Sequence, residues 1–479
     1  MAERTEKDSL GEKKVPDQVY YGIQTLRAIE NFPISGYTAP KVFVKAYVMI
    51  KKAAALANME LGILDKRLGN AIIKACDEVL NNNFCDQFIV DVFQAGAGTS
   101  FNMNVNEVLA NRSLEILGEK KGNYKVLSPN DHVNLGQSTN DTFPSALHIS
   151  LLISILPLLE EVEWLSDAFD KLGKDYCFVI KSGRTHLQDA LPVTLGQEFS
   201  AYASAIKAGG FQIKERSKLL EYIALGGTAT GTGAGAHPEY AELAISELNR
   251  LTGLNLKPAE NSFTALQSRG AATAVSGSLK ELALELIRIS NDLRLLSSGP
   301  TTGFAEITLP AVQPGSSIMP GKVNPVMAEC MNMICFQIVG NDLAVSLAAQ
   351  AGQLELNVMT PIMMHNILQS ITLLTNYLPV FRTKCVEGIT VHEKRCEDYI
   401  NKNPSLAVFL MPYIGYLSAA EVAKEAFKSE RSIKDVAVEK GLLTKEEAEK
   451  VFSIEMLLGN TAKDQVSCIK RTKRKTPRT

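Results

Sequence analysis

The segment from Gly315 to Pro325 gathers side chains that can do chemistry. Its sequence is GSSIMPGKVNP, which places two hydroxyls, one ammonium group and one amide between glycines and prolines. Because those residues break regular helices and strands, the segment is predicted to be a mobile loop whose free backbone N–H groups can bind an anion. Ser316 or Ser317 can act as a nucleophile or base when its hydroxyl is activated. Lys322 can hold a carboxylate, and Asn324 can add a directional hydrogen bond.

Two other segments combine glycines with hydroxyls and amides. In Gly96–Asn104, which reads GAGTSFNMN, the glycines let the backbone approach a ligand closely. In Gly136–Asp141, which reads GQSTND, Asn140 or Asp141 is expected to cap a long helix, whose N-terminus can bind an anion. Each segment also has a purely structural interpretation, as a polar loop and as a helix cap.

One histidine lies among polar residues that could support catalysis. His186 belongs to Gly183–Ala190, which reads GRTHLQDA, and it can equally be a histidine whose hydrogen bonds are simply satisfied. The chain has six histidines and no pair at the spacing of a metal motif, which weighs against a metal site. The glycine-rich run Gly226–Gly235 is not a phosphate loop, because it lacks the Lys-Ser/Thr ending and a preceding strand.

These five segments together resemble the aspartase/fumarase superfamily, and the resemblance covers nearly the whole chain. Members of this family eliminate a group from a succinate-like substrate and release fumarate. Gly96–Asn104 resembles the family's GxGTSxNMNxNE segment, and Gly226–Gly235 resembles its GGTAxGTG loop near the active-site mouth. The match over Gly315–Pro325 is the most specific, and it favours an active loop over a connector whose serines only cap the next helix.

The resemblance implies a role for each matching side chain. Ser316 would remove the Cβ proton, and the negative charge would then spread onto the adjacent carboxylate. Neutral donors suit this task because they stabilise that charge without neutralising the base. Glu329 matches an acidic residue that pairs with His186 across subunits in relatives. The implied catalytic residues are Ser316, His186 and Lys322, and the implied substrate-binding residues are Thr99, Ser100, Ser138, Thr139, Asn140, Thr185, Ser317 and Asn324.

Several positions favour deamination of L-aspartate over hydration of fumarate. Gln137–Asp141 reads QSTND where fumarases usually have QSSND, and Pro325 is followed by Val-Met where they usually continue with Thr-Gln. Ser128–Asp131 also lacks the histidine that fumarases commonly place there. A class II fumarate hydratase is the alternative enzyme, and a structural protein with the same fold is the alternative from another class. Two departures bear on this choice. Thr301 stands where both aspartases and fumarases usually have Arg, and Met411 stands where relatives usually have Asn.

Long stretches of helical periodicity predict a mainly α protein with three domains. These are a mixed, mostly helical N-terminal domain at 1–140, a central long-helix bundle at 141–388 carrying the loop 315–325, and a small C-terminal helical domain at 389–479. Strand signals are almost absent, and Asp86–Asn104 is predicted to be a loop followed by a helix from about Glu107. The predicted central helices are Asp141–Gly173, Pro192–Ile223, Pro238–Thr252, Ser268–Ser297, Pro325–Gln350 and Asn357–Val386.

Helices this long and this apolar on several faces predict packing against other subunits. The family resemblance implies a homotetramer in which four central domains form one helical core and each active site draws on three subunits. The expected substrate is a small dicarboxylate, and neither nucleic acid nor a membrane is an expected partner. No cofactor is expected. Some relatives use an activating divalent cation, but no ligand cluster for one is visible in the sequence.

The composition is that of a soluble globular protein. The 479 residues are 46% hydrophobic and 21% charged, with a net charge of -2, so the body offers no field for nucleic acid or a membrane surface. The longest apolar run, Ile149–Leu159, is predicted to be too short to span a bilayer, and the polar N-terminal residues do not resemble a signal peptide. Eight scattered cysteines predict reduced thiols and a cytoplasmic location. The basic tail 470–479 is expected to be a solvated end, with nucleic-acid binding or nuclear import as the alternative.

Overall fold

The computed structural model describes residues 2–459, and that part of the chain contains sixteen α-helices. Contacts divide it into two compact units. Unit 1 comprises Met1–Leu159, Phe211–Ala283 and Ile334–Thr375, and unit 2 comprises Glu160–Gly210, Leu284–Met333 and Asn376–Thr479. The prediction of a mainly α protein is confirmed. The division into three domains stays a prediction, and the basic tail 470–479 lies outside the described residues.

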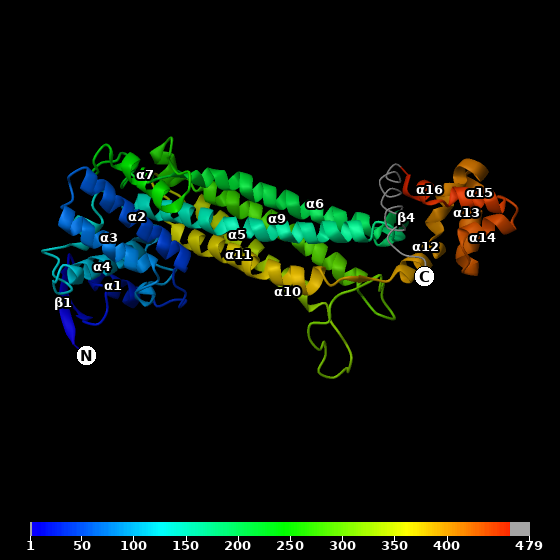
Figure 1. Cartoon of the computed structure of the whole chain (residues 1–479), viewed down its shortest axis with the longest axis horizontal. Helices are drawn as coiled ribbons and strands as arrows, with labels where there is room; N and C mark the ends of the chain where they lie inside the picture. Colours follow the sequence, from blue (N-terminus) through cyan, green and yellow to red (C-terminus); the bar gives the residue numbers. More distant parts are fainter. Residues whose placement is uncertain (1, 460–479) are drawn as a thin grey trace, which may run out of the picture. The chain divides into compact units, whose positions relative to one another are not determined.

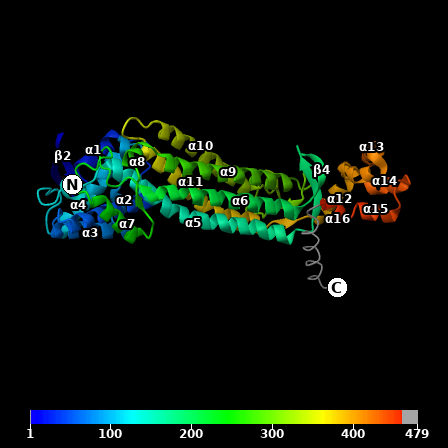
Figure 2. The same ribbon diagram turned by 90° about the horizontal axis from the view of Figure 1, so that it is seen from above.

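Five long helices contribute residues to both units. They lie side by side in two views at right angles, as Figures 1 and 2 show. Their bounds are α5 Thr139–Asp175, α6 Leu195–Ser217, α9 Gly270–Leu296, α10 Val326–Gln350 and α11 Thr360–Phe381.

Unit 1 adds a layer of helices around the N-terminal part of α5. α2 packs against both α3 and α7, and α3 packs against α4. A parallel pair of two-residue strands and an N-terminal hairpin complete the unit. The elements are β1 Glu3–Asp8, β2 Gly11–Pro16, α1 Ile23–Asn31, α2 Lys41–Glu60, α3 Lys66–Leu80, α4 Thr99–Ile116, β5 Tyr222–Ile223, α7 Tyr240–Thr252, β6 Lys257–Pro258 and α8 Ser262–Gln267.

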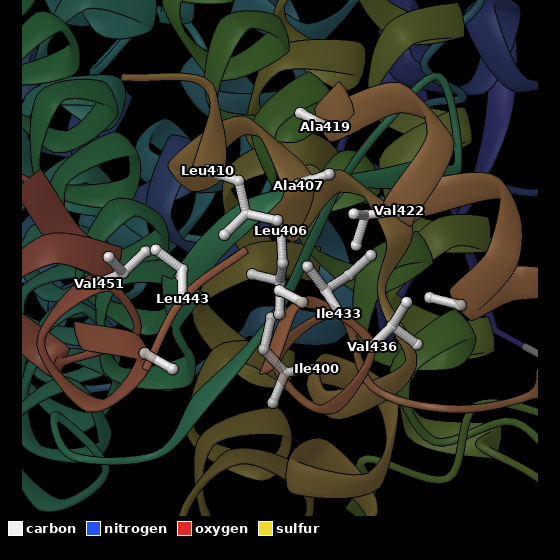
Figure 3. Packing of buried hydrophobic residues seen from close by; sticks show 13 residues of the cluster. Ile400, Leu406, Ala407, Leu410, Ala419, Val422, Ile433, Val436, Leu443 and Val451 are labelled. Atoms are coloured by element: carbon white, nitrogen blue, oxygen red, sulfur yellow. The ribbon is translucent and has the colours of Figure 1, made fainter. Parts of the chain in front are cut away.

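Unit 2 contains a second hairpin and a cluster of short C-terminal helices. The cluster has its own apolar core, which includes Leu410, Val422 and Val436 and is drawn in Figure 3. Ile180, the first residue of β3, packs against that core. The elements are β3 Ile180–Thr185, β4 Gln188–Thr194, β7 Ile307–Thr308, β8 Thr390–Val391, α12 Glu393–Lys402, α13 Met411–Ser429, α14 Ile433–Glu439, α15 Lys445–Val451 and α16 Ile454–Leu458.

The predicted helix ranges match the long helices well. The predictions are wrong where polar residues are buried. α10 begins one residue after the predicted start and ends at the predicted residue, Gln350. α4 begins at Thr99, so the predicted loop through Asn104 is wrong. Asn102 and Asn104 are buried on this helix among apolar residues, so no single apolar stripe contrasts with a polar face. The hairpins β1–β2 and β3–β4 were also missed, because buried positions in them carry polar residues such as Glu6, Lys181 and Ser182, so apolar alternation is weak.

Three helical segments within the described residues are long and apolar enough to cross a membrane, judged by length and composition alone. They are Thr139–Asp175, Val326–Gln350 and Pro404–Ser429. This overturns the expectation that the run at Ile149–Leu159 is too short, because the helix extends well beyond it on both sides. In Thr139–Asp175, 61% of the apolar window is buried inside the structure, so this helix forms core.

The cysteines are only partly as expected. Six are free thiols, namely Cys76, Cys85, Cys330, Cys335, Cys385 and Cys396. Cys177 is disulfide-bonded, so the expectation of reduced thiols is wrong at that position. Which thiols come within bonding distance is set by tertiary structure, and cysteine spacing in a long chain does not reveal it.

Candidate active site

A polar cavity of about 520 Å³ opens in unit 1 where two helices begin. Thr99 starts α4 and Thr139 starts α5, and both residues line the cavity. Unpaired N–H groups and the positive end of the helix dipole make such N-termini attractive to anions. The lining contains no charged side chain. It consists of Gln24, Thr99, Asn102, Met103, Asn130, Asn134, Gly136, Gln137, Ser138, Thr139, Asn140, Thr228, Ala229, Ala234 and Gly235.

The start of α5 is fixed by a reciprocal cap. Ser138 Oγ accepts the N–H of Asn140 at 3.2 Å, and Asp141 Oδ1 accepts the N–H of Ser138 at 3.0 Å. The capping side chain is therefore Ser138, and the prediction of Asn140 or Asp141 as the cap is wrong. The reason is that Asp141 reaches back to the cap residue, as in a capping box. Asn140 instead donates to the carbonyl of Ala229 at 2.8 Å.

Asp141 also holds the glycine-rich loop against α5. Its Oδ2 accepts the N–H groups of Gly226 at 3.1 Å and Thr228 at 3.0 Å. Thr228 is a β-branched residue with φ +54°, a conformation that costs free energy and is sustained by such contacts. Its hydroxyl is buried with no hydrogen-bond partner among the described residues, although the residue lines the cavity. A strained residue with an unused hydroxyl is typical of a ligand site.

A buried lysine lies behind the cavity wall. Lys51 on α2 is 0% exposed, and its ammonium group donates to amide oxygens of Asn102, Asn134 and Gln137. Burial lowers the pKa of Lys51 to about 7, while nearby Asp141 opposes that shift. Burial likewise raises the pKa of Asp141 to about 7, against the effect of its backbone hydrogen bonds. Lys51 cannot be recognised as a site residue from the sequence, because nothing distinguishes it there from other lysines on a helix.

The histidine segment forms a tight hairpin in unit 2. Thr185 at the end of β3 pairs with Gln188 at the start of β4, so His186 and Leu187 form a two-residue turn. Their φ values are +56° and +59°, as in the type I′ turns that suit twisted hairpins. Thr185 and His186 are both exposed at this tip. No local signal marks this turn, because His-Leu is not one of the usual turn pairs.

A buried ionic network anchors the base of that hairpin. Lys181, 1% exposed, lies 2.6 Å from Glu306 and 2.8 Å from Glu198. Arg184 lies 2.8 Å from the other oxygen of Glu306. Asn403 binds the hairpin from the C-terminal segment, donating to the carbonyl of Ala190 at 2.7 Å. These ion pairs and this hydrogen bond hold the base of the hairpin rigidly, and the tip extends from it.

The segment 315–325, the signature loop, belongs to unit 2 and is closed at its neck. The N–H of Gly315 donates to the carbonyl of Lys322 at 2.8 Å, and Asn324 Nδ2 donates to the carbonyl of Gly315 at 2.6 Å. Lys322 Nζ donates to Asn324 Oδ1 at 2.8 Å. The lysine and the amide are therefore preorganised together. Ser317 and Lys322 are exposed, whereas Ser316 is half-buried.

Ser316 already receives two backbone donors. Its Oγ accepts the N–H groups of Ile318 at 3.2 Å and Met319 at 3.0 Å. N–H groups aimed at a hydroxyl oxygen favour the deprotonated form, because they stabilise its negative charge. Ser316 is therefore better suited than Ser317 to act as a base, which supports the prediction that the family resemblance implies.

The predicted residues thus fall into two groups. The unit 1 cavity brings together Thr99, Ser138, Thr139 and Asn140, with half-buried Ser100 next to Thr99. Unit 2 carries Thr185, His186, Ser316, Ser317, Lys322, Asn324 and Glu329.

Within unit 2 the signature loop and the histidine hairpin are separate. Among the described residues, no hydrogen bond or ion pair joins His186 to Ser316, Lys322 or Glu329. The two departures noted in the sequence, Thr301 and Met411, are both exposed. No group of three or more His, Cys, Asp or Glu side chains that could hold a metal ion occurs in the described part of the chain.

Comparison with known families gives a consistent assignment along the chain. The family model described as "Lyase" matches residues 11–340, and the model described as "Fumarase C C-terminus" matches residues 406–459. Three of the curated relatives are aspartate ammonia-lyases. The one from a Bacillus species is 48% identical over 94% of this chain and 96% of its own length. The one from Bacillus subtilis (strain 168) is 49% identical over 94% of this chain and 95% of its own length. The one from Escherichia coli (strain K12) is 47% identical over 95% of this chain and 96% of its own length.

Solved structures give the same fold. A Brucella melitensis protein titled fumarate lyase:delta crystallin, bound to cobalt, superposes with a TM-score of 0.91 at 47% identity, covering 94% of this chain and 98% of that one. A class II fumarase from Schistosoma mansoni superposes with a TM-score of 0.92 at 39% identity, covering 96% of this chain and all of that one.

Proposed function

The chain belongs to the lyase family, within the aspartase/fumarase superfamily, and on that basis we propose that it deaminates L-aspartate reversibly to fumarate and ammonium. It is a carbon–nitrogen lyase, because its identity to aspartate ammonia-lyases extends over nearly the whole length of both chains. That full-length identity is the observation that carries the assignment. Class II fumarate hydratase is the competing activity. A class II fumarase has the same fold, and this chain carries the C-terminal segment named after fumarase C.

The unit 1 cavity supplies the donors that the reaction needs. Removing the Cβ proton leaves a carbanion whose charge must spread onto the neighbouring carboxylate, which then carries two negative charges. Thr99, Ser138 and Thr139 would donate to that carboxylate, together with the backbone at Ser317. Such donors are each worth about 2.7–4 kcal/mol in other enzymes. An uncharged lining at two helix N-termini supports this role, because it attracts an anion without protonating it.

Ser316 would be the base that takes the Cβ proton. The N–H groups of Ile318 and Met319 support this, because they would stabilise negative charge on the oxygen when its proton is displaced. Lys322 and Asn324 would bind the α-carboxylate, and their mutual hydrogen bond preorganises them for it. Asn140 and His186 would contact the amino group, with Thr185 beside them.

The complete site would form in a homotetramer in which three subunits contribute to each active site. Placing His186 on a rigid hairpin tip supports this, because an exposed, anchored tip suits insertion into a neighbouring chain. Turnover would need no cofactor, and a divalent cation would act only as an activator. The protein would act in the cytoplasm on a small dicarboxylate, without a nucleic-acid or membrane partner.

The test is a two-substrate assay on the purified protein. Fumarate absorbs in the ultraviolet, so its release is followed after adding L-aspartate and, separately, L-malate. Fumarate from L-aspartate alone is the expected result. Fumarate from L-malate alone would assign the hydratase activity instead, and no fumarate from either substrate would favour a structural role.

A further inference from the structure

We propose that Lys51 is a positioning residue that fixes one substrate carboxylate in the unit 1 cavity through its buried positive charge. The inference rests on the proposed function, because it concerns how that substrate is held. Lys51 touches no solvent and does not line the cavity. It acts through the amide side chains that form the cavity wall.

All three protons of the ammonium group are committed to that wall. Lys51 Nζ lies 2.8 Å from Asn102 Oδ1, 2.9 Å from Gln137 Oε1 and 3.0 Å from Asn134 Oδ1. Each of these amides lines the cavity. Lys51 therefore sets the orientation of three wall residues, because an amide whose oxygen faces an ammonium group cannot flip without losing a charge-assisted hydrogen bond.

The charge of Lys51 is not neutralised by an ion pair. No carboxylate lies within ion-pair distance of it among the described residues. The acid that acts on it, Asp141, has its oxygens engaged by the N–H groups of Ser138, Gly226 and Thr228. A buried ammonium group without a counter-ion is costly, so its field is available to an anion in the cavity.

Other groups around Lys51 do not supply that counter-charge. The Tyr47 ring lies 5.5 Å from its ammonium group, and burial raises the pKa of the Cys76 thiol far above neutrality. A carboxylate bound in the cavity would thus be the partner that favours the charged lysine. Because negative charge on that carboxylate grows during proton removal, the attraction should be stronger in the transition state than in the bound substrate.

The experiment compares two neutral variants of adjacent lysines on α2. Lys51→Gln keeps a hydrogen-bonding side chain without the charge. Lys52→Gln is the matched control, because Lys52 pairs with Asp77 and not with the cavity wall. Succinate serves as the probe, since it carries both carboxylates but cannot react. Its dissociation constant is measured by titration calorimetry, and kcat and KM are measured with L-aspartate.

We expect Lys51→Gln to raise the succinate dissociation constant roughly tenfold and to lower kcat by a further factor of roughly ten. Lys52→Gln should leave all three values within about twofold of the unmodified protein. If Lys51→Gln does not fold, Lys51→Met carries the same test. Unchanged succinate affinity in a folded variant would overturn the inference. So would a loss of active protein at unchanged KM, because that is the mark of a purely structural residue.

This outcome is separable from failure of the proposed reaction. If the unmodified protein releases no fumarate from L-aspartate, the reaction is wrong, and the succinate titration still decides whether Lys51 holds a carboxylate. If fumarate is released and Lys51→Gln binds succinate normally, the reaction stands and the role of Lys51 is wrong.

Discussion

Ser316 is the residue whose local bonding most directly suggests its chemistry. Two N–H groups converge on its oxygen, whereas Ser317 next to it is exposed and accepts neither. Two adjacent hydroxyls of identical chemistry thus differ only in what the loop backbone presents to them. Residue type alone does not distinguish the two serines, whereas the family resemblance implies Ser316, and the loop conformation supports the same choice.

We predict that Ser316→Ala lowers kcat for L-aspartate by roughly 10²–10⁴-fold, the usual contribution of a positioned base. The oligomeric state should not change, because the side chain is half-buried in a loop. Steady-state kinetics and size-exclusion chromatography measure the two quantities. Ser317→Ala is the comparison and should lose less activity. Near-normal turnover in Ser316→Ala would show that another group is the base.

A second residue-scale prediction concerns acid stability. Burial lowers the pKa of His148 on α5 to about 4, and the charge of Arg269 adds to this effect. The folded protein therefore keeps His148 neutral at pH 5, while the unfolded chain, with a pKa near 6.5, binds a proton. The contribution of neutral His148 to the free energy of unfolding is therefore fully present above pH 6.5, and it is lost as the pH falls towards about 4.

His148→Gln should remove that part of the acid sensitivity while keeping a donor for the Tyr222 carbonyl. Urea unfolding at several values between pH 7 and pH 4 should give a shallower loss of unfolding free energy in the variant. His237→Gln, at an exposed histidine, is the control. If the unfolding free energy depended on pH equally in the unmodified protein, His148→Gln and His237→Gln, the lowered pKa of His148 would be contradicted.

At the scale of elements, the C-terminal helices depend on one small core. Leu410, at the start of α13, is 0% exposed within it, while Leu417 farther along α13 is 78% exposed. Ile180 of β3 packs on the same core, which links it to the hairpin that carries His186. Loss of packing in this cluster should therefore also loosen the base of the β3–β4 hairpin.

Leu410→Ala is expected to lower the unfolding free energy by about 2–5 kcal/mol, because it leaves a cavity in a packed core. Leu417→Ala within α13 should change it by less than about 0.5 kcal/mol. Thermal unfolding followed by circular dichroism provides the comparison. Similar losses in the two variants would mean that the apolar cluster is not what holds these helices.

At the scale of the whole molecule, α10 carries apolar residues that its own chain does not cover. Phe336, Leu343 and Leu347 are 58%, 61% and 53% exposed. With Gly340, they follow alternating steps of four and three residues, the spacing of a helix-to-helix seam. Large apolar side chains repeated at this spacing are typical of a surface that another helix covers.

Phe336→Glu should break the proposed tetramer into smaller species, because a charge cannot be buried in such a seam without a partner. Analytical ultracentrifugation measures the mass, and activity should fall with it. Phe427→Glu, at a 76% exposed residue of α13, is the control and should leave the mass unchanged. A tetramer that survives Phe336→Glu would exclude this face as an interface.

Sharing of active sites between subunits gives a separate prediction. Ser316→Ala and Ser138→Ala should each be nearly inactive alone. When the two variants are unfolded together and refolded as mixed oligomers, activity should return, because some sites then take both serines from intact copies. A mixture as inactive as its components would mean that one chain supplies both residues.

The sequence by itself determined most of the chemistry and the long helices. Glycine and proline in the signature loop and the long, mostly apolar sequence of α10 are local features, so they can be read from neighbouring residues alone. The start of α4 was missed because its buried face is amide-rich, and the His186 turn was missed because its two residues adopt positive φ without glycine.

Only the tertiary structure decided which distant groups act on one another. Lys51 and Gln137 lie 86 positions apart, Asp141 and Thr228 lie 87 positions apart, and no local pattern links either pair. Burial then changes the chemistry of these side chains, because a charge removed from water depends on the few groups that surround it. An ordinary helical lysine thereby becomes a fixed cation behind an uncharged cavity wall.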